Sequence, residues 1–497
     1  MNGSTLFAGI DVGTSGVKAI LIDTRGNVVA SSTAPLALST PSPGWAEQDP
    51  NAWWAATITA LQDVLSRQTQ ARVAAVGISG QMHSSVFLNA VGEVIRPALL
   101  WCDGRTTAQC DFITARAGGE SVLREWVSNP ALEGFTLPKV LWLREHEPQS
   151  FEQLATVVLA KDFIRFRLSG VLAAEPSDAS GTLMFDPAHL RWSENIMRAV
   201  DLPVTLLPDL GGSAEPLGVV TDTAATITGL PAGIPVVGGG ADNACGAAGV
   251  GAVTVGEAVA SWGTSGTVLA PTSKPVVDPG MRAHTFCHVM PNVWYVMGVV
   301  LSAGGAFSWF RDQLARDLTA NERADRLLDE EAAAVMPGAD GVTFLPYLQG
   351  ERTPHRDASA RGAFVGLSLA HTRAHLTRAV LEAVCFALRD SLSILQEMKL
   401  APHQLLLTGG GAKSPFLRTL QAEVFGLPVT TVNREEGPAY GAALLGAVGA
   451  GAFADLPAAA AATLERSAPI EPRPGAHERY HEPYRRFRAL YPALRQL

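Results

Sequence analysis

Cysteine is scarce in this sequence, and its five copies stand far apart. They are Cys102, Cys110, Cys245, Cys287 and Cys385, an odd number without a single CxxC pair. Disulfide frameworks and zinc sites use cysteines at short, recurring spacings. The sequence therefore predicts neither of them, and a reducing, cytoplasmic compartment fits it best.

Long apolar runs and clusters of positive charge are missing as well. No stretch of about 18 residues is free of polar interruption, and no basic segment followed by an apolar one opens the sequence. Charged residues make up only 17% of the chain, and the formal net charge is −9. Nucleic-acid surfaces are basic because they neutralise phosphates. We therefore expect no membrane span, no signal peptide and no nucleic-acid partner.

Hydrophobic residues account for 47% of the 497 residues, which indicates a well-buried globular protein. A single hydrophobic core rarely grows beyond about 300 residues, so this length predicts two domains. Residues 234–240 resemble a strand that ends in glycines, and a small-residue helix follows them. We place the boundary just after that helix, which gives domains over residues 1–251 and 252–497.

The tetrapeptide Gly-Thr-Ser-Gly occurs twice, at Gly13–Gly16 and at Gly263–Gly266. Each copy stands between two apolar or β-branched runs, a pattern typical of a β-hairpin with a tight turn. Backbone N–H groups and the Thr and Ser hydroxyls of such a turn can surround a phosphate. The repeat predicts two similar halves, each of which presents one phosphate loop to a ligand held between them.

Helix and strand patterns alternate around these hairpins. Asp49 is placed to cap a helix, with Pro50 at its first position. The alternation predicts two doubly wound α/β domains with a cleft between them. The expected helices cover residues 51–66, 304–314, 372–399 and 415–425, and the expected strands cover residues 28–34, 73–79, 98–101, 234–240, 343–347 and 405–408.

Asp11 ends the first strand, directly before the first glycine loop. A carboxylate beside a phosphate is unfavourable unless a cation lies between them, so Asp11 is a candidate ligand for Mg²⁺, in part through water. The alternative for Asp11 is a plain turn-capping role. Lys18, on the returning strand, either reaches phosphate oxygens or is a solvated strand lysine.

The segment Gly238–Asn243 is the best candidate for catalysis. Its glycines allow a substrate to approach closely, and Asp242 follows them at or near a helix N-terminus, where the helix dipole favours the ionised form. An ionised carboxylate placed at a hydroxyl can accept its proton as that hydroxyl attacks phosphorus. From position alone, an ordinary N-cap is an equally good interpretation of Asp242.

Three further segments carry polar groups at expected strand ends. Thr408–Pro415 has more glycines than a strand-to-helix turn needs and indicates a nucleotide contact, although it is not a GxxxxGK[ST] loop. Gln81–His83 follows a buried strand, and its His is either a ligand contact or a satisfied structural residue. Asp103 and Arg105 either contact ligand hydroxyls or pair with each other.

Taken together, these segments resemble the FGGY family of carbohydrate kinases, within the superfamily that includes actin and Hsp70-like ATPases. Two more stretches are similar to that family's signatures: Gly134–Leu143, and Gly362–Leu367 with His375–Leu376 and Ala379–Glu382. The resemblance runs from about Leu6 to Gly446, and its six separated motifs keep the family's order. It implies two similar actin-like, ribonuclease H-like domains with a cleft between them.

The resemblance also implies roles for individual residues. Asp242 matches the general base, and Asp11 matches the aspartate linked to Mg²⁺. The positions that match sugar contacts are Met82, His83, Asp242 and Asn243, beside the candidate Asp103. The positions that match ATP contacts are Thr14, Ser15, Gly263, Thr264, Gly304, Gly410, Gly411 and Ser414, beside the candidate Lys18. A homodimer is compatible with the resemblance, although no interface is visible in the sequence.

Within the family, four segments are similar to those of members that phosphorylate D-xylulose at its 5-hydroxyl with MgATP. They are Gly44–Pro50, Gly80–His83, Trp101–Arg105 and Leu348–His355. Members that act on glycerol show Arg-Glu where Met82-His83 stands, and Cys102 replaces an asparagine that is frequent in bacterial xylulose-acting members. The alternatives are a kinase for ribulose, a hexulose or gluconate, or a catalytically silent sugar-binding regulator.

Overall fold

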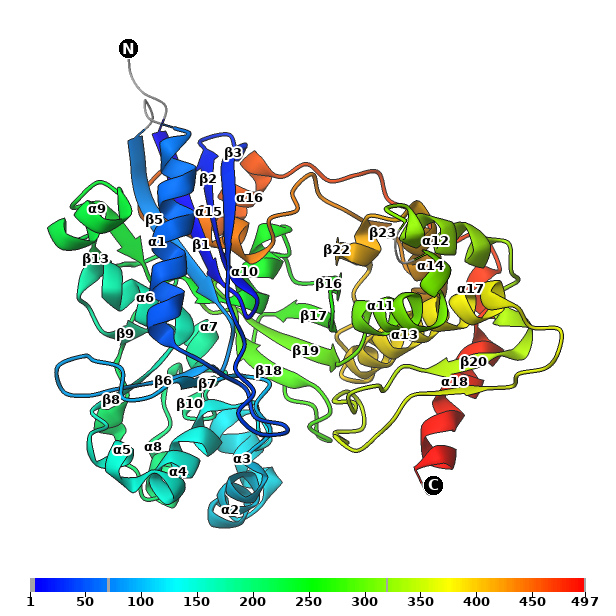
Figure 1. Cartoon of the computed structure of the whole chain (residues 1–497), viewed down its shortest axis with the longest axis horizontal. Coiled ribbons are helices and arrows are strands. Elements are labelled where there is room, and N and C mark those ends of the chain that lie inside the picture. The colour runs from blue at the N-terminus through cyan, green and yellow to red at the C-terminus, as the bar shows by residue number, and fades with distance from the viewer. Residues whose placement is uncertain (1–4, 69–71, 319–320, 496–497) are drawn as a thin grey trace.

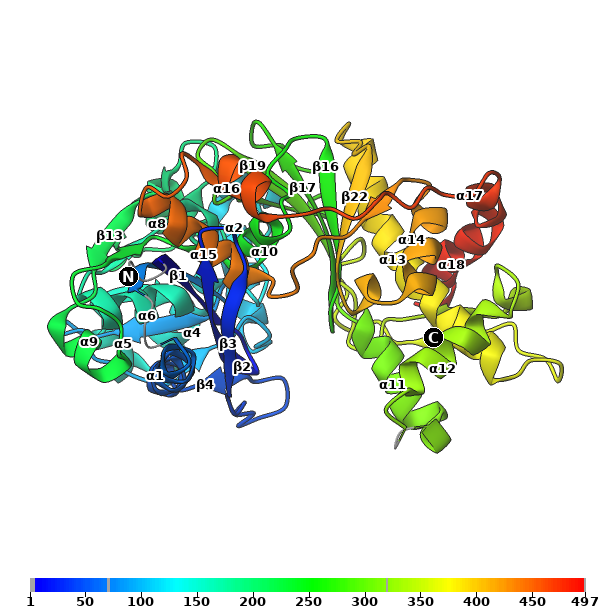
Figure 2. The ribbon, with the colours of Figure 1, turned by 90° about the horizontal axis from the view of Figure 1, so that it is seen from above.

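The protein, seen here as a computed structural model, forms two α/β lobes side by side (Figures 1 and 2). The structure describes residues 5–68, 72–318 and 321–495. Residues 1–4 and 496–497, the outer ends of the two expected domains, lie outside the described residues. Each lobe is built on one large mixed sheet, and in Figure 2 the green strands of the second sheet lie on the side toward the first lobe.

The sheet of the first lobe has the strand order β13-β14-β5-β1-β2-β3, with β15 paired to β5. β1, β2 and β3 are antiparallel neighbours, whereas β5 and β14 continue the sheet in parallel with β1. The strands are β1 (Thr5–Val12), β2 (Gly16–Asp23), β3 (Val28–Pro35), β5 (Arg72–Gly80), β13 (Pro216–Val219), β14 (Pro235–Val237) and β15 (Gly240–Ala241).

The sheet of the second lobe repeats this scheme in the order β18-β19-β17-β16-β22-β23. β16 and β17 form the second hairpin, β19 extends it antiparallel, and β22 and β23 run parallel to β16. The duplicated hairpin predicted from Gly-Thr-Ser-Gly is therefore confirmed. The strands are β16 (Glu257–Trp262), β17 (Gly266–Thr272), β18 (His284–Cys287), β19 (Trp294–Val300), β22 (Gln404–Gly409) and β23 (Val429–Thr430).

Alternation along β1 explains how helices cover both faces of the first sheet. Leu6, Ala8 and Ile10 point into the apolar core beneath α1 (Pro50–Ser66) and α6 (Ala160–Ser169), because successive side chains of a strand face opposite sides. Gly9 points to the other face, where α15 (Pro438–Gly449) lies so close that a Cβ would stand 2.0 Å from the carbonyl oxygen of Ala439.

The helix α15 belongs to the C-terminal part of the chain but packs on the first sheet, together with α16 (Leu456–Thr463) and α10 (Asp242–Gly249) (Figure 1). Gly77 on β5 shows the same close approach, since a Cβ there would lie 1.8 Å from the carbonyl oxygen of Ala442. Small residues on α15 thus bring its backbone against the strands, and the chain crosses between the lobes a second time.

Most elements begin and end near the predicted residues. Asp49 caps α1 by accepting from the N–H of Asn51 at 2.9 Å, with Pro50 at the first position. The remaining long helices of the second lobe are α11 (Gly304–Leu314), α12 (Ala324–Ala333), α13 (Arg373–Glu397) and α14 (Pro415–Phe425). β20 (Thr343–Leu345) and β21 (Ala363–Val365) form a short hairpin in the same lobe.

Three predicted strands differ from the structure, and one of them, expected over residues 343–347, ends at Leu345 as β20. The strand expected over residues 234–240 is interrupted, because the N–H groups of Gly238 and Gly239 bond to Glu215 and Ser213 instead of to β5. The strand expected over residues 98–101 shortens to β7 (Ala98–Leu99), since the N–H of Asp103 closes a turn onto the carbonyl of Leu100 at 3.1 Å.

A subdomain of short elements extends the first lobe toward the second. It holds a small sheet with the strand order β4-β7-β6-β8, in which β4 covers Glu47–Gln48, β6 covers Ser85–Leu88 and β8 covers Thr156–Leu159. It also holds the helices α2 (Thr107–Ala117), α3 (Glu120–Val127) and α4 (Thr136–His146). Asn129 donates from Nδ2 to the carbonyl of Thr285 in the second lobe at 2.8 Å. Among the described residues, none of the helices has both the length and the apolar character needed to cross a membrane.

Candidate active site

The short strands β14 and β15 lie beside β5 in the first sheet, and Asp242 directly follows β15. Gly239 adopts φ +74°, and a Cβ there would stand 1.9 Å from the carbonyl oxygen of Ile78, so only glycine fits this turn. Beyond it, Gly240 pairs with Ser79 of β5, and Ser79 pairs in turn with Asp11 of β1. The register therefore places Asp11 and Asp242 at neighbouring strand ends.

Asp242 is the first residue of α10, after the N-cap Ala241. Its Oδ1 accepts from the backbone N–H of Asn243 at 2.7 Å and from the Nδ2 of the same residue at 2.9 Å. Burial, followed by the charge of Asp11, raises the pKa of Asp242 to about 7. The dipole of α10 was expected to keep this group ionised, but desolvation outweighs that effect here. Such a carboxylate can take up a proton near neutral pH.

Asp11 has the surroundings of a cation ligand. Its Oδ1 is buried without a hydrogen-bond partner among the described residues. Burial raises the pKa of Asp11 to about 6, while the Ser79 hydroxyl and the charge of Lys18 act in the opposite direction. No group of three or more His, Cys, Asp or Glu suited to a metal occurs in the described parts of the chain. A lone carboxylate fits Mg²⁺, which keeps much of its water and shares phosphate oxygens.

The first glycine loop is tied to its own lobe. The Thr14 hydroxyl donates to Oε1 of Gln81 at 3.0 Å and accepts from Nε1 of Trp101 at 2.9 Å. Gln48 donates to the Thr14 carbonyl at 2.7 Å. Ser15 is exposed, and Lys18 faces Asp11 across the β1–β2 ladder.

A cavity of about 150 Å³ lies where the two lobes face each other at Asp242. Its lining combines the first-lobe helix α10 with strands β16, β17 and β22 and with the start of α15. The residues around it include Asp242, Asn243, Gly246, Ser261, Thr267, Thr408, Gly437 and Pro438. Asp242 and Asn243, predicted from sequence, are thus brought to the interface between the lobes.

A larger cavity of about 620 Å³ occupies the second lobe next to the second glycine loop. Six of the sequence-predicted ATP positions line it, namely Gly263, Thr264, Gly304, Gly410, Gly411 and Ser414. Thr14, Ser15 and Lys18 do not, since they belong to the first lobe. Neighbouring residues line the two cavities: Ser261 and Thr408 line the smaller one, while Trp262 and Gly410 line the larger one.

Sequence reasoning missed part of the lining of the larger cavity. Phe307 and Asp329, on α11 and α12, contribute an apolar wall and an acid. Burial raises the pKa of Asp329, and a hydrogen bond with Ser414 lowers it in part. Neither residue belongs to a glycine-rich segment, so no local pattern marks it.

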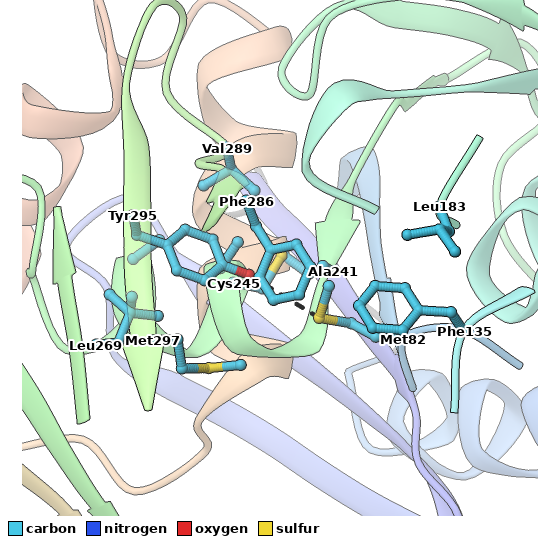
Figure 3. Packing of buried hydrophobic residues seen from close by; sticks show 14 of the residues in the cluster. Met82, Phe135, Leu183, Ala241, Cys245, Leu269, Phe286, Val289, Tyr295 and Met297 are labelled. Carbon is cyan, nitrogen blue, oxygen red and sulfur yellow. Dashed lines mark hydrogen bonds between the residues drawn. The ribbon is translucent and has the colours of Figure 1, made fainter. Parts of the chain in front are cut away.

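His83 and Met82 lie on the first-lobe side of the interface. His83 has φ +67°, and its Nδ1 contacts the carbonyl of Gly181. Burial lowers the pKa of His83 to about 3, so the ring is neutral and Nε2 remains as an acceptor. Figure 3 shows Met82 meeting Tyr295 of the second lobe, whose hydroxyl donates to the Met82 Sδ at 3.9 Å.

Lys139 supports this region, although the sequence did not indicate it. The side chain is buried, and Nζ donates to the carbonyls of His83 at 3.0 Å and Gly134 at 2.7 Å. Burial lowers the pKa of Lys139 to about 7. Its only sequence signal is a place inside the Gly134–Leu143 motif.

Asp103 pairs with Arg105, which was one of the two alternatives that the sequence left open. Oδ2 of Asp103 accepts from Nη2 of Arg105 at 2.7 Å and from the N–H of Ala46 at 2.6 Å. The Arg105 guanidinium also lies 3.7 Å from the ring centre of Trp45. The carboxylate of Asp103 is fully buried in these contacts, so a sugar-binding role for it stays a prediction that this arrangement does not favour.

Comparison with known proteins agrees with this geometry. Residues 6–249 match the N-terminal domain of the FGGY family of carbohydrate kinases, and residues 258–450 match its C-terminal domain. Over 491 residues, the chain is 38% identical to a xylulose kinase of Bacillus subtilis (strain 168), which covers 98% of this chain and 97% of that protein.

Solved structures show the same fold. A xylulose kinase from Rhodospirillum rubrum superposes with a TM-score of 0.90 at 32% identity and covers 99% of each chain. A gluconate kinase from Lactobacillus acidophilus superposes with a TM-score of 0.92 at 26% identity, over 99% of this chain and 98% of that one. With both lobes matched, this chain belongs to the FGGY family of carbohydrate kinases.

Proposed function

We propose that the protein transfers the terminal phosphoryl group of ATP to the 5-hydroxyl of D-xylulose, with Asp242 as the general base. The observation that carries this proposal is the position of Asp242. Asp242 lines the small cavity between the lobes together with Ser261. The residues that follow Ser261, from Trp262 to Thr264, line the nucleotide-sized cavity. The pKa of Asp242, about 7, suits a group that accepts a proton at neutral pH.

The sugar would bind against the first lobe, next to Met82, His83 and Asn243. ATP would occupy the 620 Å³ cavity, with its phosphates directed past Gly263 and Thr264 toward the smaller cavity. Because the transition state of phosphoryl transfer is loose, Asp242 mainly orients the hydroxyl and removes its proton late in the reaction. Closure of the lobes would exclude water and limit wasteful hydrolysis of ATP.

Mg²⁺ would be held by Asp11, whose buried Oδ1 lacks a partner, together with water and phosphate oxygens. When bound, the ion supplies charge neutralisation for the phosphates. Asp242 is close enough for the charge of Asp11 to contribute, after burial, to its raised pKa. Lys18, opposite Asp11, adds a positive charge on the same side.

The test is ADP formation by the purified protein with D-xylulose beside D-ribulose, L-ribulose, gluconate and glycerol. We expect D-xylulose to give the highest kcat/KM. A higher value for another sugar would reassign the substrate within the family. Binding of a sugar without any sugar-dependent ADP formation would favour the regulator alternative.

A further inference from the structure

We propose that Arg352, which comes from the second lobe, is a sugar-binding residue that donates hydrogen bonds to oxygen atoms of the ketose. The inference rests on the proposed function of the cleft. It adds a contact from the lobe that also holds the nucleotide cavity, whereas the sugar positions expected from the sequence all lie in the first lobe.

The backbone around Arg352 is fixed to the end of β19. The N–H of Thr353 donates to the carbonyl of Val299 at 3.0 Å, and the N–H of Val299 donates back to the Thr353 hydroxyl at 3.0 Å. Oε1 of the buried Glu351 accepts from the N–H groups of Leu301 at 2.9 Å and of Arg352 at 2.8 Å. Arg352 therefore starts from a well-defined position.

The guanidinium of Arg352 reaches across to the first lobe. Its Nη2 lies 3.4 Å from the point where a Cβ on Gly134 would stand, and the carbonyl oxygen of Trp101 lies 2.8 Å from that same point. Lys139 joins the carbonyls of Gly134 and His83. Arg352 thus lies next to the turn at Gly134, which Lys139 connects to His83.

Within the described part of the chain, the Arg352 guanidinium makes no hydrogen bond and no ion pair. The acids whose charge acts on it are Glu133 and Glu351. Oε1 of Glu133 accepts from the Thr107 hydroxyl at 3.1 Å, and Oε1 of Glu351 is bound to backbone N–H groups. Arg356, by contrast, pairs with Glu120 at 2.9 Å.

Arg352 is half-buried, and none of its nitrogens is among the buried side-chain atoms that lack a partner, so its donors are open to a ligand as well as to water. The guanidinium carries five N–H donors in one plane, and a ketose offers neutral hydroxyl and carbonyl oxygens that match them. Charge from Arg352 also contributes, after burial, to the lowered pKa of His83. Arg352 and His83 are thus near enough to interact electrostatically, and the Arg352 donors and the neutral His83 ring suit an uncharged, oxygen-rich ligand.

This contact would make the sugar a bridge between the lobes. Glu351 and Thr353 tie Arg352 to Leu301 and Val299, a few residues before Gly304 at the nucleotide cavity. A ketose held by His83 and Arg352 binds the closed arrangement more tightly than the open one, and so shifts the population toward closure.

The experiment compares the wild type with Arg352→Gln, Arg352→Lys and the control Arg356→Gln. We expect Arg352→Gln to raise the KM for D-xylulose by about tenfold or more, while the KM for ATP changes by less than about twofold. Arg352→Lys should fall between these values, because a single point charge remains. Arg356→Gln should leave both KM values near the wild type, since its ion pair is partly exposed.

Two results would overturn the inference: an unchanged KM for D-xylulose in a folded Arg352→Gln protein, or equal increases in the KM for sugar and ATP. If Arg352→Gln melts well below the wild type, the Lys variant decides by the same criteria. If the wild type shows no ADP formation with D-xylulose, the proposed function fails. Calorimetric titration of the sugar panel into wild type and Arg352→Gln then decides the inference by itself, because weaker binding supports it and equal binding refutes it.

Discussion

The two lobes carry the same tetrapeptide on the same kind of hairpin, yet the two loops have different surroundings. In the first lobe, the Thr14 hydroxyl is held between Gln81 and Trp101. In the second, the Thr264 side chain lines a cavity of about 620 Å³ and its hydroxyl has no hydrogen bond among the described residues. The same loop sequence is therefore held by side-chain hydrogen bonds in the first lobe and lines a cavity in the second.

The residues just before the loops differ as well. Asp11 stands two positions before the first loop, and Ser261 occupies the same place before the second. The hairpin repeats give equivalent backbone positions, but a carboxylate stands on one side only. In the function proposed above, this difference corresponds to cation binding and base catalysis in the first lobe and nucleotide binding in the second.

The largest expected effect comes from Asp242→Asn, which removes the proton acceptor from the first lobe. Turnover should fall by on the order of 10²- to 10⁴-fold, since that is the usual contribution of a general base. Sugar binding should persist, and the melting temperature should not fall, because the variant removes a desolvated charge. Steady-state kinetics, calorimetric sugar titration and a thermal melt measure these quantities; turnover near the wild-type level would exclude Asp242 as the base.

The next largest effect concerns the Mg²⁺ requirement, and it distinguishes Asp11 from Ser261, which occupy equivalent positions before the two loops. Asp11→Asn should raise the Mg²⁺ concentration needed for half-maximal activity by about tenfold or more, because a carboxylate ligand is lost. The matched variant Ser261→Ala should leave that concentration nearly unchanged. A magnesium titration of activity in both variants makes the comparison, and equal shifts would contradict the division between the lobes.

Substitutions of the two loop threonines should have smaller effects on two different quantities, the KM for ATP and the free energy of unfolding. Thr264→Val should raise the KM for ATP by a few fold and leave thermal stability alone. Thr14→Val should lower the free energy of unfolding by about 1–3 kcal/mol, because the Nε1–H of Trp101 loses its acceptor. Denaturant melts and ATP titrations of both variants test this, and loss of stability in Thr264→Val with none in Thr14→Val would reverse the assignment.

The smallest expected effect is a displacement of the pH profile. Asp242 accepts a proton only when ionised, so kcat/KM should rise with pH and level off above the raised pKa of about 7. Asp11→Asn removes a negative neighbour, which lowers the pKa of Asp242 and moves this acid limb to lower pH by less than about one unit. The profile is measured at saturating Mg²⁺; a shift to higher pH would contradict the coupling of the two acids.

Local patterns predicted the hairpins, the capped helix α1 and the helices α11 and α14, because tight turns, caps and apolar periodicity are short-range signals. They did not predict the interruption of residues 234–240, which arises from hydrogen bonds to Glu215 and Ser213. Nor did they identify Asp329, Tyr295 or Lys139 as parts of the candidate site. These residues reach the site only through packing between distant elements.

The amino-acid order by itself determined that this chain has two halves, that each carries a glycine turn between strands, and that acids stand beside such turns. Only the tertiary structure decided which copy opens onto a cavity and which is tied down by Trp101 and Gln81. The reason is physical: a turn is specified by a few neighbouring residues, whereas hydrogen-bond partners, burial and the charge of Asp11 felt by Asp242 depend on segments that meet only in the folded protein.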